Sequence, residues 1–463
     1  MSANCKLVAN FIFTCFLFSN CHLFSFSSID TFAIPRSVLA KDVHLNESEV
    51  HEKIKNAIEW HNYQYLGRLL KENVGRTIAL NDVRQIAREL QCQKLFHAVE
   101  ATAVFYKQQS RVLGLPRSDF LQIALFIETN LQEFIQKKQH YIPKEETSLA
   151  TSLEYDPKTR KIFIILPDNK QTHLGQGKNK VVMKAILYQE RNSEVVARAL
   201  QTKVREIELK TTNDLKGAKG VMEIVACTEY NSNGTTYRTI YSKLYNPGAL
   251  QRAFSKRMRF SVYEKMKIAL NILNGLEELH KRNIAHRDLS AVNCLIDIPK
   301  GSIGRRNVIA VIADFGRSNS ILKTYDKRLN PQGHSAYMPP EAIFKGKVQG
   351  EQVCRTDIYA AGCIFYQLFH GKLAPWQNSK YVQQISIAEF DRHKALVSKI
   401  NHYTAARRSK LEHKRNLGII SPCAAFELLI LRMCQPDAEK RGTASELHQM
   451  MQKIFDQHSM IKR

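Results

Sequence analysis

Apolar residues recur at helical spacing between about residue 46 and residue 140, with polar residues between them. A step of three or four residues places side chains on one face of a helix. The positions that carry the pattern are Ile54, Ile58, Leu66, Leu69 and Leu70, and later Phe120, Ile123, Ala124, Ile127 and Leu131. Asn46 and Glu49 in "NESE" supply a cap for the first helix. We therefore predict a helical accessory or partner-binding domain over residues 41–145.

After residue 149 the pattern changes to short runs rich in β-branched and aromatic residues, which favour strands. These runs are "KIFIILP", "NKVVMKAILY", "EVVARAL" and "YRTIYSKLY". Beyond about Gly248 the helical spacing returns, with one helix over residues 261–281. The order predicts one α+β unit after about residue 149, in which a strand-rich lobe and a helix-rich lobe meet at a cleft.

The N-terminal residues have the layout of a secretory signal peptide. The apolar run "LVANFIFTCFLF" at residues 7–18 follows Lys6, and "TFA" ends at Ala33 with small residues for cleavage. The run is shorter than the roughly 20 apolar residues of a membrane helix. We expect a leader over residues 1–33, no stable membrane span, and an exported or secreted protein. An uncleaved anchor or a disordered leader is the alternative, and without export the chain would be cytoplasmic.

Composition adds few constraints to this picture. Hydrophobic residues at 44% and charged residues at 24% are ordinary values for a folded soluble protein. The formal net charge of +25 is spread along the chain, so we expect solvated basic faces and no nucleic-acid partner. The ten cysteines show no paired metal-ligand spacing, which argues against a disulfide framework and a zinc site.

Five motifs follow one another in the helix-rich part. "NIAHRDLSAVNCLID" occupies residues 283–297, and "NVIAVIADFG" ends at Gly316. "GHSAYMPPEAI" at 333–343, "RTDIYAAGCIFYQLFHGKLAPW" and "CQPDAEKRGTASEL" come later. In this order they resemble the motifs of eukaryotic-type protein kinases. The resemblance covers roughly residues 149–455 and implies a bilobal protein-kinase fold, with a small β-rich lobe and a large helical lobe.

The resemblance also implies an activity and its residues. Asp288 would orient the acceptor hydroxyl, and Asn293 and Asp314 would hold Mg²⁺ or Mn²⁺ beside the phosphates of ATP. The chain is thus expected to transfer the γ-phosphate of ATP to a protein substrate.

Other motif residues would have structural roles. His286 would pack, Asp357 would hold the backbone of the catalytic loop by hydrogen bonds, and Glu341 would form a buried ion pair with Arg441. Arg287 would be a buried cation or would dock a phosphorylated activation loop. The acceptor candidates for such a phosphate are Ser318, Ser320, Thr324, Tyr325 and Ser335.

"LGQGKNKVV", which runs from Leu174 to Val182, resembles the glycine-rich loop that covers the nucleotide phosphates. Gly175 and Gly177 match the family pattern, whereas Lys180 stands where a third glycine belongs. The residues that flank the nucleotide would include Leu174 and Val182.

The following strand departs from the pattern, because "EVVARAL" aligns Arg198 with the lysine that grips the phosphates. Arginine keeps the charge but presents a wider, planar fork. Arg198 itself, Lys203 after a register slip, or Lys180 would bind the phosphates. We favour Lys180, an arrangement similar to that of the with-no-lysine kinases.

Two further parts of the nucleotide site follow from the resemblance. The glutamate that pairs with the lysine would be Glu206 or Glu208, and the spacing to Leu215 favours Glu208. The hinge "SKLYNPGAL" would bind adenine through the backbone of residues Lys243 to Tyr245.

Substrate class depends on weaker features. "YMPPE" resembles the serine/threonine pattern, although Ser290 replaces the lysine that serine/threonine kinases have two positions after the catalytic Asp288. The alternative function is a pseudokinase that binds nucleotide or acts as a scaffold. The leader, combined with a kinase that needs ATP, suggests a bacterial effector exported to act in a host cytosol.

Overall fold

The computed structural model describes residues 46–59, 63–73, 79–113, 120–121, 123–125, 127–128, 152–166, 170–177, 180–189, 193–201, 210–211, 213–232, 235–298, 307–320, 335–343, 350–377 and 389–461. The predicted leader lies outside the described residues, as do Lys203, Glu206, Glu208, Thr324 and Tyr325. Within the described part, no helix is long and apolar enough to cross a bilayer.

The first part of the chain is helical, as predicted. It contains α2 (Glu47–Glu59), α3 (Tyr63–Asn73), α4 (Leu80–Glu89) and α5 (Gln93–Leu113). The cap predicted for the first helix is present: the Glu49 amide donates to Asn46 Oδ1 at 3.0 Å, and the Asn46 amide donates to Glu49 Oε2 at 2.9 Å. This reciprocal pair satisfies two backbone donors that a helix start leaves unpaired.

An antiparallel sheet follows. Its strands are β1 (Ser152–Asp156), β2 (Lys161–Ile165), β3 (His173–Gly177), β4 (Lys180–Tyr188), β5 (Glu194–Gln201), β6 (Ile224–Ser232) and β7 (Thr235–Lys243). The order across the sheet is β1-β2-β4-β5-β7-β6, and β3 pairs with β4. β1 and β6 lie at opposite ends of this order, yet Thr228 of β6 donates to Glu154 of β1 at 3.0 Å. The sheet therefore curls until its two ends meet.

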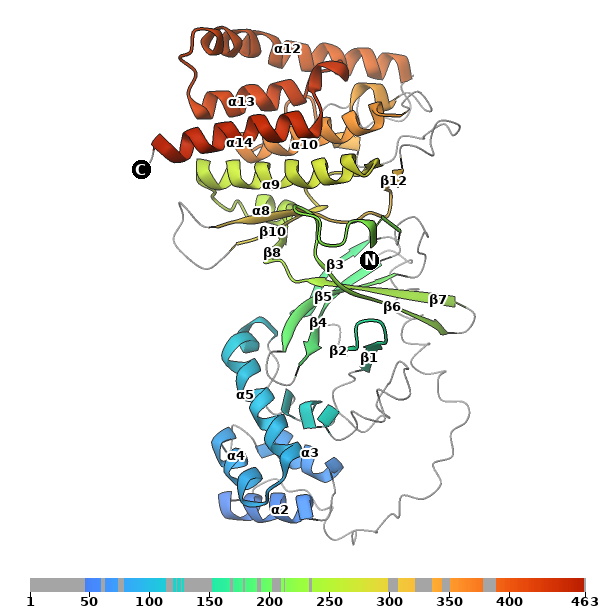
Figure 1. Cartoon of the computed structure of the whole chain (residues 1–463), viewed down its shortest axis with the longest axis vertical. Coiled ribbons are helices and arrows are strands. Elements are labelled where there is room, and N and C mark those ends of the chain that lie inside the picture. The colour runs from blue at the N-terminus through green and yellow to red at the C-terminus, as the bar shows by residue number, and fades with distance from the viewer. Residues whose placement is uncertain are drawn as a thin grey trace.

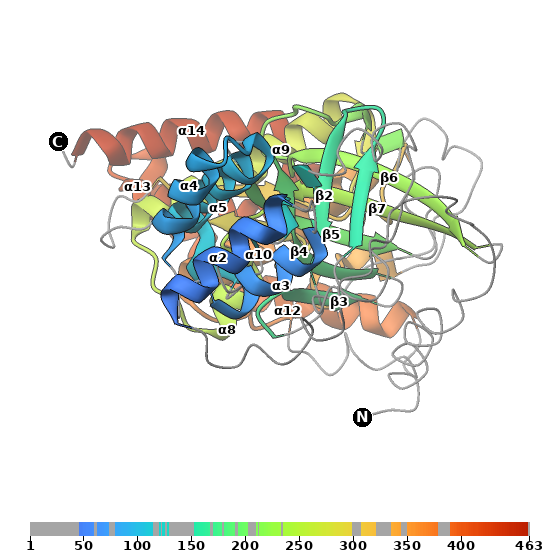
Figure 2. The ribbon, with the colours of Figure 1, turned by 90° about the horizontal axis from the view of Figure 1, so that it is seen from below.

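The accessory helices and the sheet share one hydrophobic core. Ile54, Leu66 and Phe105 of the helices belong to the same buried cluster as Ile164 of β2 and Ile186 of β4. The Tyr188 hydroxyl at the end of β4 donates to the Glu128 carboxylate. Figures 1 and 2 show α2 to α5 packed together below the sheet. The predicted boundary near residue 149 thus separates two segments of sequence that fold against each other.

The rest of the chain is mainly helical. Its helices are α8 (Leu250–Ser255), α9 (Val262–Lys281), α10 (Gln352–His370), α12 (Glu389–Asn416), α13 (Pro422–Met433) and α14 (Ala444–Ile461), with short helices η3 (Ser335–Tyr337), η4 (Pro340–Ile343) and η5 (Glu439–Arg441). The short strands are β8 (Pro247–Ala249), β9 (Ile284–Ala285), β10 (Cys294–Asp297), β11 (Ile309–Ile312) and β12 (Asn319–Ser320). The predicted α+β class, with two lobes and a helical region before them, is confirmed.

Two glycines meet where the segment before β6 crosses α9. A Cβ atom built on Gly275 of α9 would lie 2.3 Å from the Gly220 carbonyl oxygen, and Gly220 has a φ of +72°. The Ile312 amide at the end of β11 donates to that same carbonyl at 2.8 Å. This contact fixes the last residues of β11 beside the segment that leads into the sheet.

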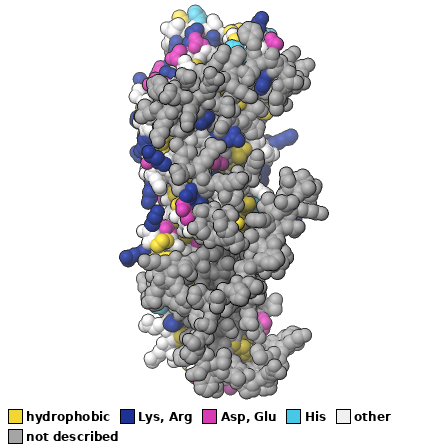
Figure 3. Space-filling view, turned by 90° about the vertical axis from the view of Figure 1, so that its right-hand side faces the viewer, with side chains coloured by type: hydrophobic (Ala, Val, Ile, Leu, Met, Phe, Trp, Pro, Cys, Tyr) yellow, Lys and Arg dark blue, Asp and Glu magenta, His cyan; other side chains and the backbone are white. Residues whose placement is uncertain are grey.

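Lysine and arginine side chains are interspersed with acidic and apolar side chains on the part of the surface that Figure 3 colours. Ion pairs such as Arg432 with Glu446 at 2.6 Å and Arg407 with Glu427 at 2.6 Å place acidic groups next to several of the cations.

Candidate active site

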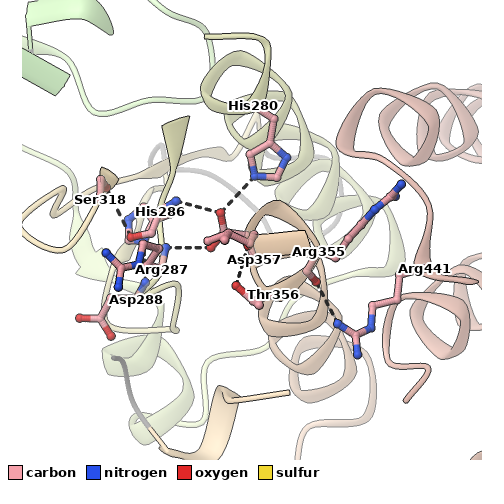
Figure 4. A network of polar contacts seen from close by, with 10 residues as sticks. His280, His286, Arg287, Asp288, Ser318, Arg355, Thr356, Asp357 and Arg441 are labelled. Atoms are coloured by element: carbon pink, nitrogen blue, oxygen red, sulfur yellow. Dashed lines mark hydrogen bonds and ion pairs between the residues drawn. The ribbon is translucent and has the colours of Figure 1, made fainter. Parts of the chain in front are cut away.

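The loop from His286 to Asn293, between β9 and β10, is held by Asp357 of α10. The amides of His286 and Arg287 donate to its two carboxylate oxygens at 2.8 Å each. His280 Nε2 lies 3.1 Å from Oδ2. Asp357 is 1% exposed, and charge-assisted hydrogen bonds are strong where water is excluded. The backbone-holding role predicted for Asp357 is confirmed (Figure 4).

His286 has the packing role that was predicted. Its ring is buried and lies edge-on to Phe315, with 5.6 Å between ring centroids. The Asp288 amide donates to Nδ1 at 3.3 Å, and Nε2 lies 3.0 Å from the Ala313 carbonyl oxygen. Because Nδ1 accepts from an amide, Nε2 is the nitrogen that can donate to the Ala313 carbonyl oxygen. The ring thereby links the catalytic loop to the backbone just before Asp314.

Asn293 is oriented by its own loop. Its Nδ2 donates to the Asp288 carbonyl oxygen at 2.8 Å, and its backbone carbonyl accepts from the Ala313 amide at 2.8 Å. Because Nδ2 is the atom that donates, Oδ1 is the atom that can bind a cation.

Asp314 directly follows Ala313, the residue after β11 whose amide Asn293 binds. It adopts a left-handed backbone conformation with a φ of +67°, an unfavourable one for a residue other than glycine. Its neighbour Phe315 is 2% exposed and anchors this turn in the core of the large lobe. Asp288, Asn293 and Asp314 are therefore brought together by the contacts of one loop and one strand end.

Lys180, at the start of β4, reaches this group from the small lobe. Its Nζ lies 3.6 Å from Asp314 Oδ2, and the lysine side chain is 23% exposed. Because neighbours across an antiparallel pair share a face, Val182 and Lys184 of β4 lie on the same face as Ala199 and Ala197 of β5. We call this the cleft face of the sheet.

Arg198 points to the opposite face, which corrects its place among the candidate phosphate ligands. Successive residues of a strand alternate between faces, so Arg198 lies behind Ala197 and Ala199. Its Nη2 donates to Glu154 Oε1 at 2.8 Å, and the arginine is 6% exposed. Burial alone would lower the pKa of Arg198, but the Glu154 carboxylate and Tyr241 raise it above its ordinary value. Arg198 is a charged structural residue inside the curled sheet.

The predicted ion pair between Glu341 and Arg441 is present. Arg441 Nη1 and Nη2 donate to Glu341 Oε1 and Oε2 at 2.5 and 2.8 Å. Arg441 is fully buried, and it also donates to the carbonyl oxygens of Gln435 and Pro436 at 2.7 and 2.9 Å. A buried arginine is tolerated when it forms a bidentate ion pair and its remaining N–H groups also have acceptors.

Comparison with known proteins identifies this constellation. The family model described as "Protein kinase domain" matches residues 169–452. The chain belongs to the protein kinase family. The match covers both the sheet from β3 onward and the helical lobe up to α14, and so it includes every catalytic-loop residue described above.

Several curated kinases are similar to this kinase. "Calcium-dependent protein kinase 4" of Plasmodium falciparum is 26% identical over 272 residues, which are 53% of this chain and 48% of the relative. "Serine/threonine-protein kinase STE11" of Saccharomyces cerevisiae is 38% identical over 104 residues, 22% of this chain and 13% of the relative. "Dual specificity protein kinase splA" of Dictyostelium discoideum is 26% identical over 194 residues, 40% of this chain and 8% of the relative. The chain thus spans about half or less of these relatives.

The predicted hinge of the kinase connects β7 to β8. Ser242 at its entrance is 5% exposed, and Lys243 is the last residue of β7. The Tyr245 hydroxyl accepts from the Glu223 amide at 3.1 Å, which fixes the segment between the lobes. Leu174, Gly175 and Gly177 lie on β3, next to β4. Of the candidate nucleotide residues, Gly175, Gly177, Lys180 and Val182 thus lie on the paired strands β3 and β4, whereas Arg198 points to the opposite face. Glu208 lies outside the described part.

The side chains of the large lobe fit a divalent cation. Asn293 offers an amide oxygen and Asp314 a carboxylate, and these are the oxygen donors that Mg²⁺ and Mn²⁺ prefer. Lys180 at 3.6 Å balances part of the Asp314 charge.

Three features of the site escaped the sequence analysis. Ala197 and Ala199 occupy the cleft face, and a lysine of β5 would have to lie on that face to reach the nucleotide. The position that corresponds to the family's lysine is therefore one residue away from Arg198. Lys184 is a second amine on that face. Arg317, directly after Gly316, lies against Asp288 with 3.4 Å between Nε and Oδ2. The alternation of side chains along "EVVARAL" was the available signal for the first feature, and the alternation along "NKVVMKAILY" was the signal for the second.

Proposed function

We propose that this chain is an ATP- and Mg²⁺-dependent protein kinase that phosphorylates serine or threonine hydroxyls. The observation that carries the proposal is the grouping of Asp288, Asn293 and Asp314 on a loop held by Asp357, with Lys180 reaching Asp314 at 3.6 Å. Similarity to kinases whose names specify serine/threonine supports the substrate class, as does the "YMPPE" segment.

Each residue of this group would act on a different part of the reaction. The Asp288 carboxylate orients the acceptor hydroxyl and accepts its proton. Asn293 and Asp314 would hold the divalent cation, which when bound neutralises charge on the phosphates. Lys180, at the start of β4, would contact phosphate oxygens in place of a lysine on β5. Ala197 and Ala199 leave β5 without a cation on the cleft face.

Transfer of radiolabelled phosphate from ATP to a generic protein substrate tests the proposal. Asp288→Asn and Asp314→Asn should each lower the rate by at least about a hundredfold, the size expected for loss of a catalytic base or a metal ligand. Chelation of divalent cations should abolish transfer. Asp437→Asn, at an exposed aspartate in the turn before η5, is a matched control and should leave the rate unchanged.

Lys180→Ala and Arg198→Met separate the two candidate cations. We expect Lys180→Ala to weaken nucleotide binding and transfer, and Arg198→Met to leave nucleotide affinity intact where the protein is folded. Retained activity in both aspartate variants would rule out the assigned chemistry. Nucleotide binding without any transfer by the unaltered chain would identify a pseudokinase instead.

A further inference from the structure

The catalytic loop lacks a cation at a position where kinases of the serine/threonine type have one. Ser290 occupies that position and is 2% exposed. Its short, uncharged side chain cannot place a positive charge beside a bound phosphate. A phosphoryl group in transfer carries charge on its equatorial oxygens, and a preorganised cation beside it lowers the barrier.

Arg317 brings a cation to the catalytic loop from a different segment of the chain. Its Nε lies 3.4 Å from Asp288 Oδ2, while the arginine side chain is 46% exposed and that of Asp288 is 22% exposed. The guanidinium therefore lies at the open side of the loop and contacts the carboxylate that would orient the acceptor hydroxyl.

The backbone on both sides of Arg317 is anchored. Before it, the Gly316 amide donates to Asp314 Oδ1 at 3.4 Å. After it, Ser318 is 2% exposed and its hydroxyl donates to the His286 carbonyl oxygen at 3.4 Å. β12 then pairs with β9, with Asn319 opposite Ala285. Arg317 is thus presented by a fixed turn, and Ser318 is too buried to serve as the predicted phosphate acceptor.

We propose that Arg317 supplies the cation that Ser290 does not, by pairing with Asp288 through Nε and binding the transferring phosphoryl group through its terminal nitrogens. The inference rests on the proposed kinase function. A planar guanidinium can bind a carboxylate along one edge and phosphate oxygens along another. Lys180 lies 3.6 Å from Asp314, so among the described residues a cation lies beside each of the two functional carboxylates.

Steady-state kinetics of the full chain test this role. Arg317→Ala should lower kcat by about a hundredfold and change KM for ATP by less than about threefold, because the lost contact acts mainly in the transition state. Arg317→Lys should retain an intermediate rate. Ser290→Lys, added to Arg317→Ala, should recover part of the loss by returning a cation to the loop.

Arg282→Ala is the matched control. Arg282 directly follows the last residue of α9 and pairs with Glu278 at 2.5 Å, and its removal should leave kcat unchanged. Thermal unfolding and nucleotide binding, measured for each variant, separate a kinetic effect from misfolding.

Two results would overturn the role of Arg317: an unchanged kcat in Arg317→Ala, or a loss confined to KM. Failure of the proposed function has a different signature, because the unaltered chain would then transfer no more phosphate than Asp288→Asn.

Discussion

Lys180 and Arg198 are cations of the same sheet that face opposite sides of it. Lys180 lies 3.6 Å from Asp314, whereas Arg198 is enclosed with Glu154. A shift of one residue in a strand moves every side chain to the other face. The catalytic loop could be read from its motif because its contacts are local or set by the family pattern. The role of Arg198 could not be predicted from the sequence, because its partner Glu154 lies 44 residues earlier, in a strand that closes the curled sheet.

Arg198→Met should destabilise the fold by about 3–5 kcal/mol, because it leaves the Glu154 charge buried without its cation. Glu154 is 2% exposed and also accepts from Thr228. Chemical denaturation measures the loss. The double variant Arg198→Met with Glu154→Gln should recover part of it, since the unpaired charge is removed. Full stability of the single variant would contradict a structural role for Arg198.

Asp357→Asn should loosen the catalytic loop, because an amide has one acceptor oxygen for the two backbone donors at His286 and Arg287. The expected cost is about 1–3 kcal/mol for a buried donor left unsatisfied. Hydrogen exchange should be faster at these two amides, together with a lower transfer rate. Unchanged exchange there would argue against the anchoring role.

At the scale of elements, the helix predicted over 261–281 is α9, and its start is set by a capping box. The Glu264 amide donates to Ser261 Oγ at 3.2 Å, and the Ser261 amide donates to Glu264 Oε2 at 2.8 Å. Such local signals are visible in the sequence. The sequence does not show which segments pack against α9, because Gly220 and the residues of α14 that contact this helix are distant from it along the chain.

Gly275→Ala should destabilise the protein although alanine favours helices by about 1 kcal/mol over glycine. A Cβ at Gly275 would lie 2.3 Å from the Gly220 carbonyl oxygen and 3.0 Å from Ile312 Cδ1, so backbone must move. A lower melting temperature and faster exchange at the Ile312 amide are the expected results. Gly371→Ala would not serve as a control for this clash, because the φ of +73° at Gly371 is itself unfavourable for alanine. A more stable Gly275→Ala protein would show that the two segments are not held in contact.

Glu277 ties α9 to α14 in a pH-dependent way. Burial raises the pKa of Glu277, but hydrogen bonds from Lys281, Ser445 and His448 together lower it by more, so the net pKa is below the ordinary 4.5. A depressed carboxyl pKa contributes stability above the pKa of the unfolded chain, and this is lost as the pH falls through the folded value. Glu277→Gln should therefore be less stable than the unaltered chain at pH 7, and the difference should shrink below pH 4.5. A difference independent of pH would contradict this.

At the scale of the whole molecule, the accessory helices act as one wall of the small lobe. Ile164, Ile186 and Val195 of the sheet are buried in the same core as the helices. The sequence predicted both parts correctly as helical and strand-rich, because periodicity is local. It did not predict that the helices pack against the sheet, since an apolar stripe shows that a face is buried but not which surface covers it.

A chain that starts at residue 149 should lose solubility and stability relative to one that starts at residue 46. Removing the helices exposes apolar side chains whose burial contributes about 1.5–3 kcal/mol each. Size-exclusion chromatography and thermal unfolding compare the two. Ile186→Ser in the full chain is a milder test of the same contact and should lower the melting temperature. A monomeric shorter chain with an unchanged melting temperature would show that the kinase lobes fold independently.

Ala197 and Ala199 on the cleft face also determine where an amine-reactive nucleotide would attach. Acyl-phosphate derivatives of ATP acylate the amine nearest the phosphates, and on this face the amines of β4 are those of Lys180 and Lys184. Burial, followed by the charge of Arg252, lowers the pKa of Lys184, which raises its neutral, nucleophilic fraction. Mass spectrometry of the digested adduct should therefore find the label on peptides from β4, and selective covalent ligands for this cleft would be directed at that strand.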